Sequence, residues 1–237
     1  MAVFAVFVRS LIMNLFDIVG PVMVGPSSSH TAGAVRIGLV SRKLLGEEIK
    51  EAQILFHGSF LATGKGHGTD RAIVAGLLNM SVDDARIPDS FKYAEDEGMK
   101  VTFGSIDLGE DAHPNSVRLI LTGASGRKLE ITASSVGGGR IMINQLDGLT
   151  TNFSGDYPTL IVHNLDQPGH IAEVTSMLQH KSVNVATMQL YRSHRGGSAV
   201  MVLECDQPVP EEGIQWLKNL EGIVKVTYYS GTNGGQK

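Results

Sequence analysis

The sequence is poor in cysteine, because Cys205 is the only one among its 237 residues. One thiol cannot form a disulfide within the chain, complete a cysteine-based zinc site or hold an iron–sulfur cluster, which needs several thiolates. A chain without disulfides suits a reducing compartment, so we expect a cytoplasmic protein with no metal site of its own.

An excess of positive charge and a long hydrophobic run are also missing. The net charge is −4, the pI is about 6.0 and the basic residues are scattered, which argues against a nucleic-acid surface. The apolar runs at residues 2–8 and 11–16 are too short to cross a membrane. They also lack the basic region and cleavage site of a signal peptide, so we interpret residues 1–12 as an extension and Met13 as an alternative start.

Hydrophobic residues make up 42% of the chain, enough for one large or two ordinary domains. The most distinctive stretch is Gly-Pro-Ser-Ser-Ser-His-Thr at residues 25–31. Apolar residues at helical spacing follow it as far as Gly46, which predicts a helix that begins at or just after the serines.

A helix that begins there predicts an anion site. The first N–H groups of a helix have no intrahelical acceptor and lie at the positive end of its dipole. The side chains expected to add to this site are those of Ser27, Ser28, Ser29, His30 and Thr31. The alternative is a simple cap, in which one serine bonds the helix backbone.

A second glycine-rich stretch, GSFLATGKGHGTD, covers residues 58–70 and resembles a Walker A sequence. Five residues separate Gly58 from Gly64 where four are required, and Gly66 follows Lys65 where Ser or Thr should bind magnesium. The departure excludes nucleotide hydrolysis.

We therefore expect residues 58–70 to form a loop that approaches a ligand closely. Lys65 would supply a cation and His67 a titratable group. Asp70 would hold His67 in one tautomer or cap the helix predicted at residues 70–79.

Strand and turn signals complete the first half of the chain. We predict strands at residues 49–58, 101–108, 116–122, 128–134 and 141–146, and a helix-and-loop connection at residues 81–99. Together with the two helices they predict an α+β domain over residues 13–149. Residues 150–158, rich in Asn, Ser, Gly, Asp and Pro, are predicted to be a linker.

The last part of the chain has a βαββαβ pattern, which predicts a ferredoxin-like domain over residues 159–230. The turn after its first strand, Asn-Leu-Asp-Gln-Pro-Gly-His at residues 164–170, resembles the ligand loop of ACT domains, which sense amino acids. This resemblance implies that ACT domains pair as a homodimer and that Asn164, Asp166 and Gly169 contact an effector.

With this domain in view, the N-terminal motifs closely resemble the β subunit of iron–sulfur-dependent bacterial L-serine dehydratase. They are FDIVGP at residues 16–21, GPSSSHTAG at 25–33, the stretch at 58–70 and His-Pro-Asn at 113–115. The resemblance implies an N-terminal domain like the allosteric substrate-binding domain of some phosphoglycerate dehydrogenases. It also implies a partner α subunit that holds a [4Fe–4S] cluster.

Deamination of L-serine to pyruvate and ammonia requires removal of the Cα proton and departure of hydroxide from Cβ. The resemblance implies that the iron acts as a Lewis acid on the hydroxyl group that leaves. The protein must then fix the carboxylate and supply a base. Candidates for the base, left unranked by the sequence, are His57, His67 and His113. Candidates for substrate binding are the serines and Thr31, with Lys65, Asp70 and Asn115, while His30 would orient the serines.

Two other functions fit the same residues. The chain could be a regulatory subunit that binds serine or another small carboxylate without catalytic groups, in which case the histidines are dispensable for turnover. A metal hydrolase is a weaker alternative, because no helical His pair or carboxylate set has a recognisable ligand spacing.

Overall fold

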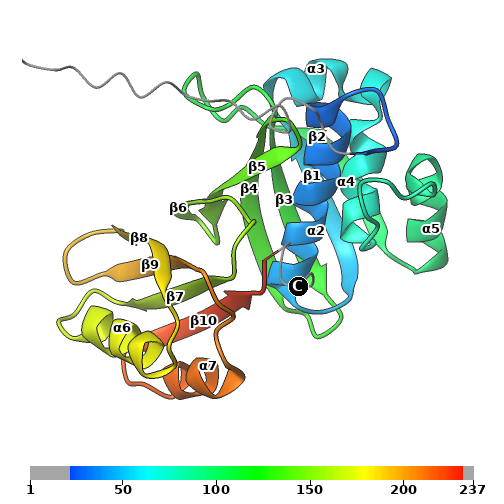
Figure 1. Cartoon of the computed structure of the whole chain (residues 1–237). Helices are drawn as coiled ribbons and strands as arrows, with labels where there is room; N and C mark the ends of the chain where they lie inside the picture. Colours follow the sequence, from blue (N-terminus) through cyan, green and yellow to red (C-terminus); the bar gives the residue numbers. More distant parts are fainter. Residues whose placement is uncertain (1–21, 232–237) are drawn as a thin grey trace, which may run out of the picture.

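The computed structural model describes residues 22–231, which form two α+β domains packed against each other (Figure 1). The predicted α+β architecture with a C-terminal βαββαβ domain is confirmed. The predicted extension at residues 1–12 lies outside the described residues. Among the helices of residues 22–231, none has the length and apolar character needed to cross a membrane.

A six-stranded mixed sheet organises the first domain, in the order β2-β1-β3-β4-β5-β6. The strands are β1 Ile49–Phe56, β2 Lys100–Ser105, β3 Ser116–Gly123, β4 Lys128–Gly137, β5 Arg140–Leu146 and β6 Leu149–Phe153. β1 and β2 are parallel, and all other neighbours are antiparallel. Alternate residues such as Ala52 and Ile54 of β1 face a buried core, as expected for a sheet with one covered face.

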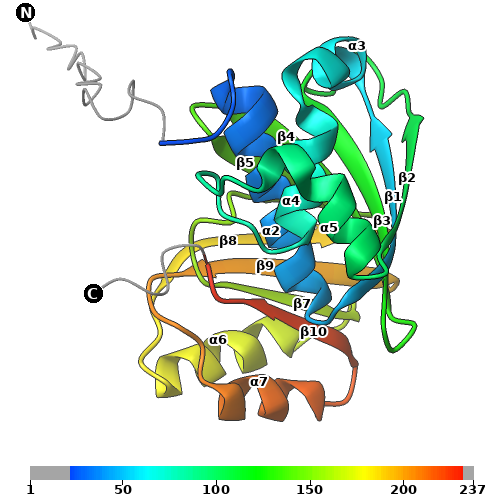
Figure 2. The same cartoon turned by 90° about the vertical axis from the view of Figure 1, so that its right-hand side faces the viewer.

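Helices cover that face (Figure 2). They are η1 Ser28–Gly33, α2 Ala34–Leu45, α3 Gly58–His67, α4 Thr69–Leu77, η2 Ile87–Asp89 and α5 Ser90–Asp96. α2 ends at Gly46, as predicted, in the left-handed conformation. α2 and α4 touch backbone to backbone, because a Cβ on Gly76 would lie 2.1 Å from the carbonyl oxygen of Val35. This close crossing fixes the direction in which the start of α2 points.

Two predictions about this domain are wrong. Residues 58–67 form the helix α3 and not a loop, although glycine disfavours helices. Burial of Phe60 and hydrogen bonds from the first turn to the carbonyl of Pro114 stabilise it. The predicted linker begins with a strand, since β6 pairs with β5 and buries Phe153, so the connection between the domains is residues 154–158.

The second domain is a four-stranded antiparallel sheet in the order β10-β7-β9-β8 with two helices on one face. Its elements are β7 Thr159–Leu165, α6 His170–His180, β8 Val185–Arg192, β9 Ser198–Cys205, α7 Glu211–Lys218 and β10 Ile223–Tyr229. Cys205 is fully buried, and burial raises the pKa of its thiol to about 11. It packs as a small apolar residue among the side chains of the second domain.

The other face of this sheet packs on the first domain. Ile161, Val200 and Val202 are buried in the same core as α2 and the six-stranded sheet, whereas Leu160 and Val162 face α6 and α7. The sheet therefore has a buried core on each face, and the core on the face away from α6 and α7 is shared with the first domain.

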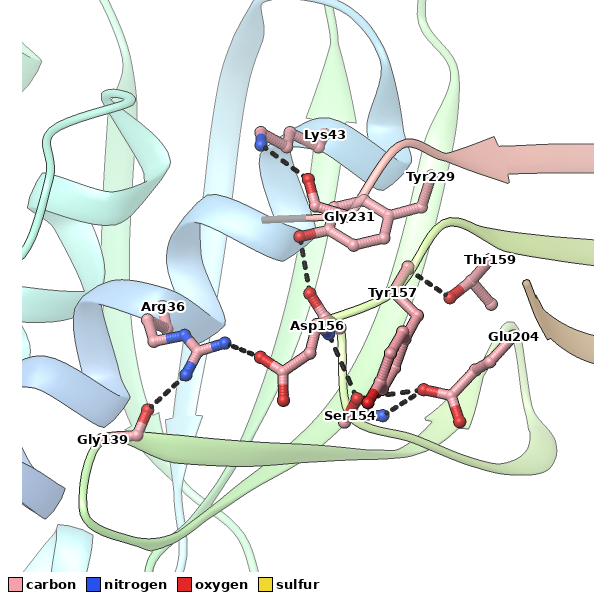
Figure 3. Close-up of polar contacts among 11 residues, drawn as sticks. Arg36, Lys43, Gly139, Ser154, Asp156, Tyr157, Thr159, Glu204, Tyr229 and Gly231 are labelled. Atoms are coloured by element: carbon pink, nitrogen blue, oxygen red, sulfur yellow. Dashed lines mark hydrogen bonds and ion pairs between the residues drawn. The ribbon is translucent and has the colours of Figure 1, made fainter. Parts of the chain in front are cut away.

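Polar contacts reinforce the junction (Figure 3). Arg36 of α2 donates to the carbonyl of Gly139 at 3.0 Å and forms an ion pair with Asp156 of the connection. The buried hydroxyl of Tyr229 donates to the carbonyl of Gly155 at 2.9 Å. Since Arg36 follows η1 by one turn of helix, the second domain is tied to the helix that carries the serines.

Candidate functional site

The serine stretch forms the start of a continuous helix. Ser27 is its N-cap, and its Oγ accepts a hydrogen bond from the backbone N–H of His30 at 3.2 Å. Ser28 and Ser29 lie in the first turn of the π-helix η1, which runs directly into α2. Their half-exposed hydroxyls have no hydrogen-bond partner in the part of the chain that the structure describes. Both the simple cap and two further hydroxyls at the helix start are therefore present.

The π-helical turn is held by close contacts on its inner side. Thr31 is 3% exposed, and a Cβ on Gly25 would lie 2.5 Å from its side chain. A Cβ on Gly33 would lie 2.1 Å from the Oγ of Ser135 on β4. Short π-helical segments often occur at functional sites. Thr31 faces inward, so it is not on the surface that exposes Ser28 and Ser29.

His30 lies between this turn and α3. Its Nε2 is 3.0 Å from Thr63 Oγ1 and 3.4 Å from Ser59 Oγ, and its Nδ1 is 3.4 Å from Ser27 Oγ. Its ring centroid is 4.9 Å from that of His67. Burial lowers the pKa of His30, and repulsion from a protonated His67 lowers it further. The neutral imidazole is thus the favoured form of His30.

α3 presents Ser59, Thr63 and His67 together because they are four residues apart, one turn of helix each. Ser59 and Thr63 were missed by the sequence interpretation, which treated this stretch as a loop. The i, i+4, i+8 spacing of these polar residues was the signal that would have identified them, because it places them on one side of a helix.

The His-Pro-Asn turn at residues 113–115 lies against the start of α3. The carbonyl of Pro114 accepts from the N–H of Ser59 at 2.7 Å, and a Cβ on Gly58 would lie 2.6 Å from that oxygen. The carbonyl of Asn115 accepts from the N–H of Ser135 at 2.9 Å. Three of the four motifs singled out in the sequence therefore meet at one end of the six-stranded sheet, and the fourth, at residues 16–21, lies outside the described residues.

The three histidines considered as bases have different surroundings. His57 is the N-cap of α3, with Nδ1 at 3.3 Å from both the carbonyl of Ile106 and the N–H of Leu108. His113 is exposed, and its Nδ1 accepts from the N–H of Asn115 at 3.1 Å. His67 is exposed at the end of α3 and makes no hydrogen bond to another described residue.

Asp70 and Lys65 are two further residues that the sequence predicts to bind substrate. Asp70 accepts from the N–H of Arg71 in the first turn of α4 and lines a hollow beside Phe103, with no bond to His67. Lys65 belongs to α3, but its side chain lies outside the described set. The structure thus brings His30, His67 and Ser27 together, with Ser28 and Ser29 in the same turn as His30, and Asp70 forms no bond to any of them.

In the predicted effector loop of the second domain, the carboxylate of Asp166 already has hydrogen-bond partners within the domain. Asp166 Oδ2 accepts from the N–H of Gly196 at 2.9 Å and from Arg192 at 3.3 Å. These contacts lower the pKa of Asp166, the bond from Gly196 most. The amide of Asn164 is buried and donates to the carbonyl of Leu165, and Gly169 has a φ of 110° that favours glycine.

Two family models match this chain, one over each domain. Residues 158–222 match the model of the ACT domain, so the fold and its loop define an ACT-domain protein. Residues 12–145 match the model of the serine dehydratase beta chain. The chain belongs to this family and is a subunit of L-serine dehydratase, an ammonia-lyase.

Three relatives illustrate the match. The chain is 42% identical to the probable L-serine dehydratase beta chain of Bacillus subtilis, over 90% of this chain and 96% of that protein. It is 37% identical to the L-serine dehydratase beta chain of Peptoniphilus asaccharolyticus, over 84% and 89%. It is 30% identical to the L-serine dehydratase of Mycobacterium bovis, over 62% of this chain but only 35% of that protein.

Proposed function

We propose that this chain supplies one half of the active site of L-serine dehydratase. Ser28 and Ser29 at the start of η1 bind the carboxylate of L-serine, and His67 removes the proton from Cα. The other half comes from a partner α chain. The observation that carries the proposal is the contact between the serine turn and α3. It places the ring of His67 4.9 Å from that of His30, which belongs to the same turn as Ser28 and Ser29.

The surroundings of η1 support carboxylate binding. The first N–H groups of the helix lack intrahelical acceptors, and the hydroxyls of Ser28 and Ser29 add donors at the same place. No carboxylate of a described residue forms a hydrogen bond or ion pair with His30 or His67. A negatively charged substrate would therefore meet donors there and no fixed negative charge.

Three observations favour His67 as the base over the other candidates. Its ring is exposed and has no hydrogen bond to another described residue, so it can approach a substrate. His57 is engaged by the backbone at residues 106 and 108, and His113 by the N–H of Asn115. The ring of His30 lies beside His67, and burial lowers the pKa of His30, so the neighbour of His67 is an uncharged ring.

A [4Fe–4S] cluster does not fit this chain. No group of three or more His, Cys, Asp or Glu side chains within residues 22–231 is arranged to hold a metal, and Cys205 is buried in the ACT sheet. We therefore assign the cluster to the partner α chain, and we assign to this chain only binding of the carboxylate and removal of the proton.

For the second domain we propose a regulatory role. An amino acid effector would place its ammonium group near Asp166, with Asn164 and Gly169 shaping the loop, and the effector site would be completed by a second copy of the chain. We also infer that the assembly works in the reducing cytoplasm, where a cluster-dependent partner is preserved.

The test is reconstitution of this chain with its α chain under anaerobic conditions, followed by assay of pyruvate from L-serine. We expect each chain alone to be inactive and the mixture to be active. His67→Ala should lower kcat by about 10²- to 10⁴-fold, the usual contribution of a general base. His57→Ala and His113→Ala are the matched comparisons, and a larger loss in either would transfer the role of base to it.

The second candidate function is a serine sensor without catalytic groups. It is favoured by the ACT domain and by the direct link from Arg36 to the interdomain connection. Under this function, His67→Ala in the reconstituted complex keeps the wild-type kcat and changes only the response to an effector.

A further inference from the structure

Three large apolar side chains gather on the surface beside α3. Leu61 of α3 is 49% exposed, Phe91 of α5 38% and Phe103 of β2 46%. Leu61 and Phe103 line a hollow of about 360 Å³, whose wall includes Phe56 and Phe60. We call Leu61, Phe91, Phe103 and this hollow the α3 flank patch. Contiguous exposed apolar surface of this kind marks interaction sites.

The α3 flank patch is continuous with the candidate site through a chain of ring contacts. The centroid distances are 5.3 Å from His30 to Phe60, 6.4 Å from Phe60 to Phe56 and 6.2 Å from Phe56 to Phe103. A further 5.6 Å joins Phe103 to Phe91. Aromatic pairs at these distances attract one another, so the patch and the ring of His30 belong to one packed layer.

The border of the α3 flank patch is charged. Asp70 lines the hollow, and the guanidinium of Arg71 lies 5.9 Å from the ring centroid of Phe91. An apolar centre with aromatic side chains and a charged rim is the composition of a protein–protein interface. A lipid surface would not require a carboxylate within the hollow, so this border favours a protein.

We propose that the α3 flank patch is the seat of the α chain of L-serine dehydratase, which inserts an apolar side chain into the hollow. The proposal rests on the proposed function, because a partner that completes the site must approach the exposed side of α3. The helix α3 carries exposed residues of both surfaces, namely Thr63 and His67 of the candidate site and Leu61 of the patch. The Mycobacterium bovis enzyme, which this chain matches over 35% of its length, shows that related sequences are joined to a larger remainder.

The test uses the full chain with its α chain. Sedimentation velocity under anaerobic conditions gives the dissociation constant, and pyruvate formation with increasing amounts of this chain gives the limiting rate. The variants are Leu61→Asp and Phe103→Asp, because a buried charge at an interface opposes association. Trp216→Asp on α7, where Trp216 is 47% exposed, is the matched control. Circular dichroism confirms that each variant is folded.

We expect Leu61→Asp and Phe103→Asp each to raise the dissociation constant at least tenfold, while Trp216→Asp changes it less than twofold. The limiting rate at saturation should stay within twofold of wild type for Leu61→Asp. Folded variants that bind the α chain as tightly as wild type would overturn the proposal, as would an equal loss in Trp216→Asp. Variants that alter only self-association of this chain would also overturn it, because the occupant would then be a second copy.

Failure of the proposed function gives a different result. If the wild-type mixture forms no pyruvate, the catalytic proposal fails. Sedimentation still decides docking, because weaker binding of Leu61→Asp than of Trp216→Asp would support the α3 flank patch without any measurement of activity.

Discussion

The two predicted ligand surfaces differ in the charge that they offer. At η1 and α3, hydroxyls, N–H groups and two histidines meet without a carboxylate contact among the described residues. In the ACT loop, Asp166 is held ionised by Gly196 and Arg192. Because an amino acid carries both charges, the first surface suits its carboxylate and the second its ammonium group. Under the proposed function, the two domains would therefore contact opposite ends of the same class of ligand.

The largest expected effect comes from removing the side chains proposed to bind the substrate carboxylate at η1. Replacing Ser28 and Ser29 together by Ala removes two donors to an ionised group, each contributing about 1.5–3 kcal/mol. We expect kcat/KM for L-serine to fall by at least a hundredfold in the reconstituted complex. Ser193→Ala in the second domain is the control, and an equal loss there would show that the effect is not specific to η1.

The two domains also differ in how closely the backbones of their helices approach their neighbours. Gly76→Ala would force a Cβ against the carbonyl oxygen of Val35, which belongs to the rigid backbone of α2. Overpacking of this kind costs about 1–3 kcal/mol of unfolding free energy. Gly213→Ala on α7 meets only the flexible side chain of Met177, so we expect it to be close to neutral. Chemical denaturation of both variants checks this, and equal losses would contradict the account.

A smaller effect concerns the orientation of His30. Thr63→Val removes a hydrogen bond to Nε2, and a neutral bond contributes about 0.5–1.5 kcal/mol. We expect kcat to fall about threefold to tenfold with KM little changed. Thr63→Ser keeps the hydroxyl and should restore most of the rate. A Ser variant as slow as the Val variant would show that the methyl group matters and not the bond.

The junction between the domains should respond to pH through His163. Burial lowers the pKa of His163, and the nearby charge of Lys225 lowers it further, while Asp147 opposes this. The unfolded chain therefore binds the proton more readily. Stability from the neutral ring is complete above the unfolded pKa of about 6.5 and is lost as pH falls through the lower folded pKa.

We expect this loss to be smaller than the effect of Gly76→Ala. His163→Gln should flatten the fall in melting temperature between pH 7.5 and pH 5.5, measured by calorimetry. His180→Gln on the exposed side of α6 is the control. The same pH dependence in wild type and His163→Gln would refute the assignment.

The smallest expected effect is on the ACT side. Asp166→Asn removes the charge proposed to meet an effector's ammonium group and leaves η1 and α3 untouched. We expect kcat and KM without effector to stay within twofold of wild type. A loss of basal turnover comparable to that of the double serine variant would remove the distinction between the two surfaces.

Much of the fold could be predicted because hydrophobic periodicity and turn residues agree with it. The six elements of the ACT domain and the end of α2 at Gly46 follow from local sequence. α3 did not, because its four flanking and internal glycines oppose a helix, and the stabilising contacts from Phe60 and Pro114 are tertiary. β6 was missed for the same reason, since it is stabilised by pairing with β5.

The site was predictable in composition but not in arrangement. The serines, His30 and His67 stand in motifs that the sequence singles out. The inward direction of Thr31 and the separation of Asp70 from His67 depend on the π-helical turn and on the end of α3 at Gly68, which local patterns do not reveal. Contacts between residues 30 and 63 require the packed helices themselves.

The most direct test of the account is the kinetic isotope effect on kcat with L-serine deuterated at Cα, measured for wild type and His67→Ala in the reconstituted complex. If His67 removes this proton, the variant should be about 10²- to 10⁴-fold slower and its isotope effect should rise above that of wild type, since proton removal becomes the slowest step. A variant with nearly wild-type kcat, or with a lower kcat and an unchanged isotope effect, would contradict the assignment.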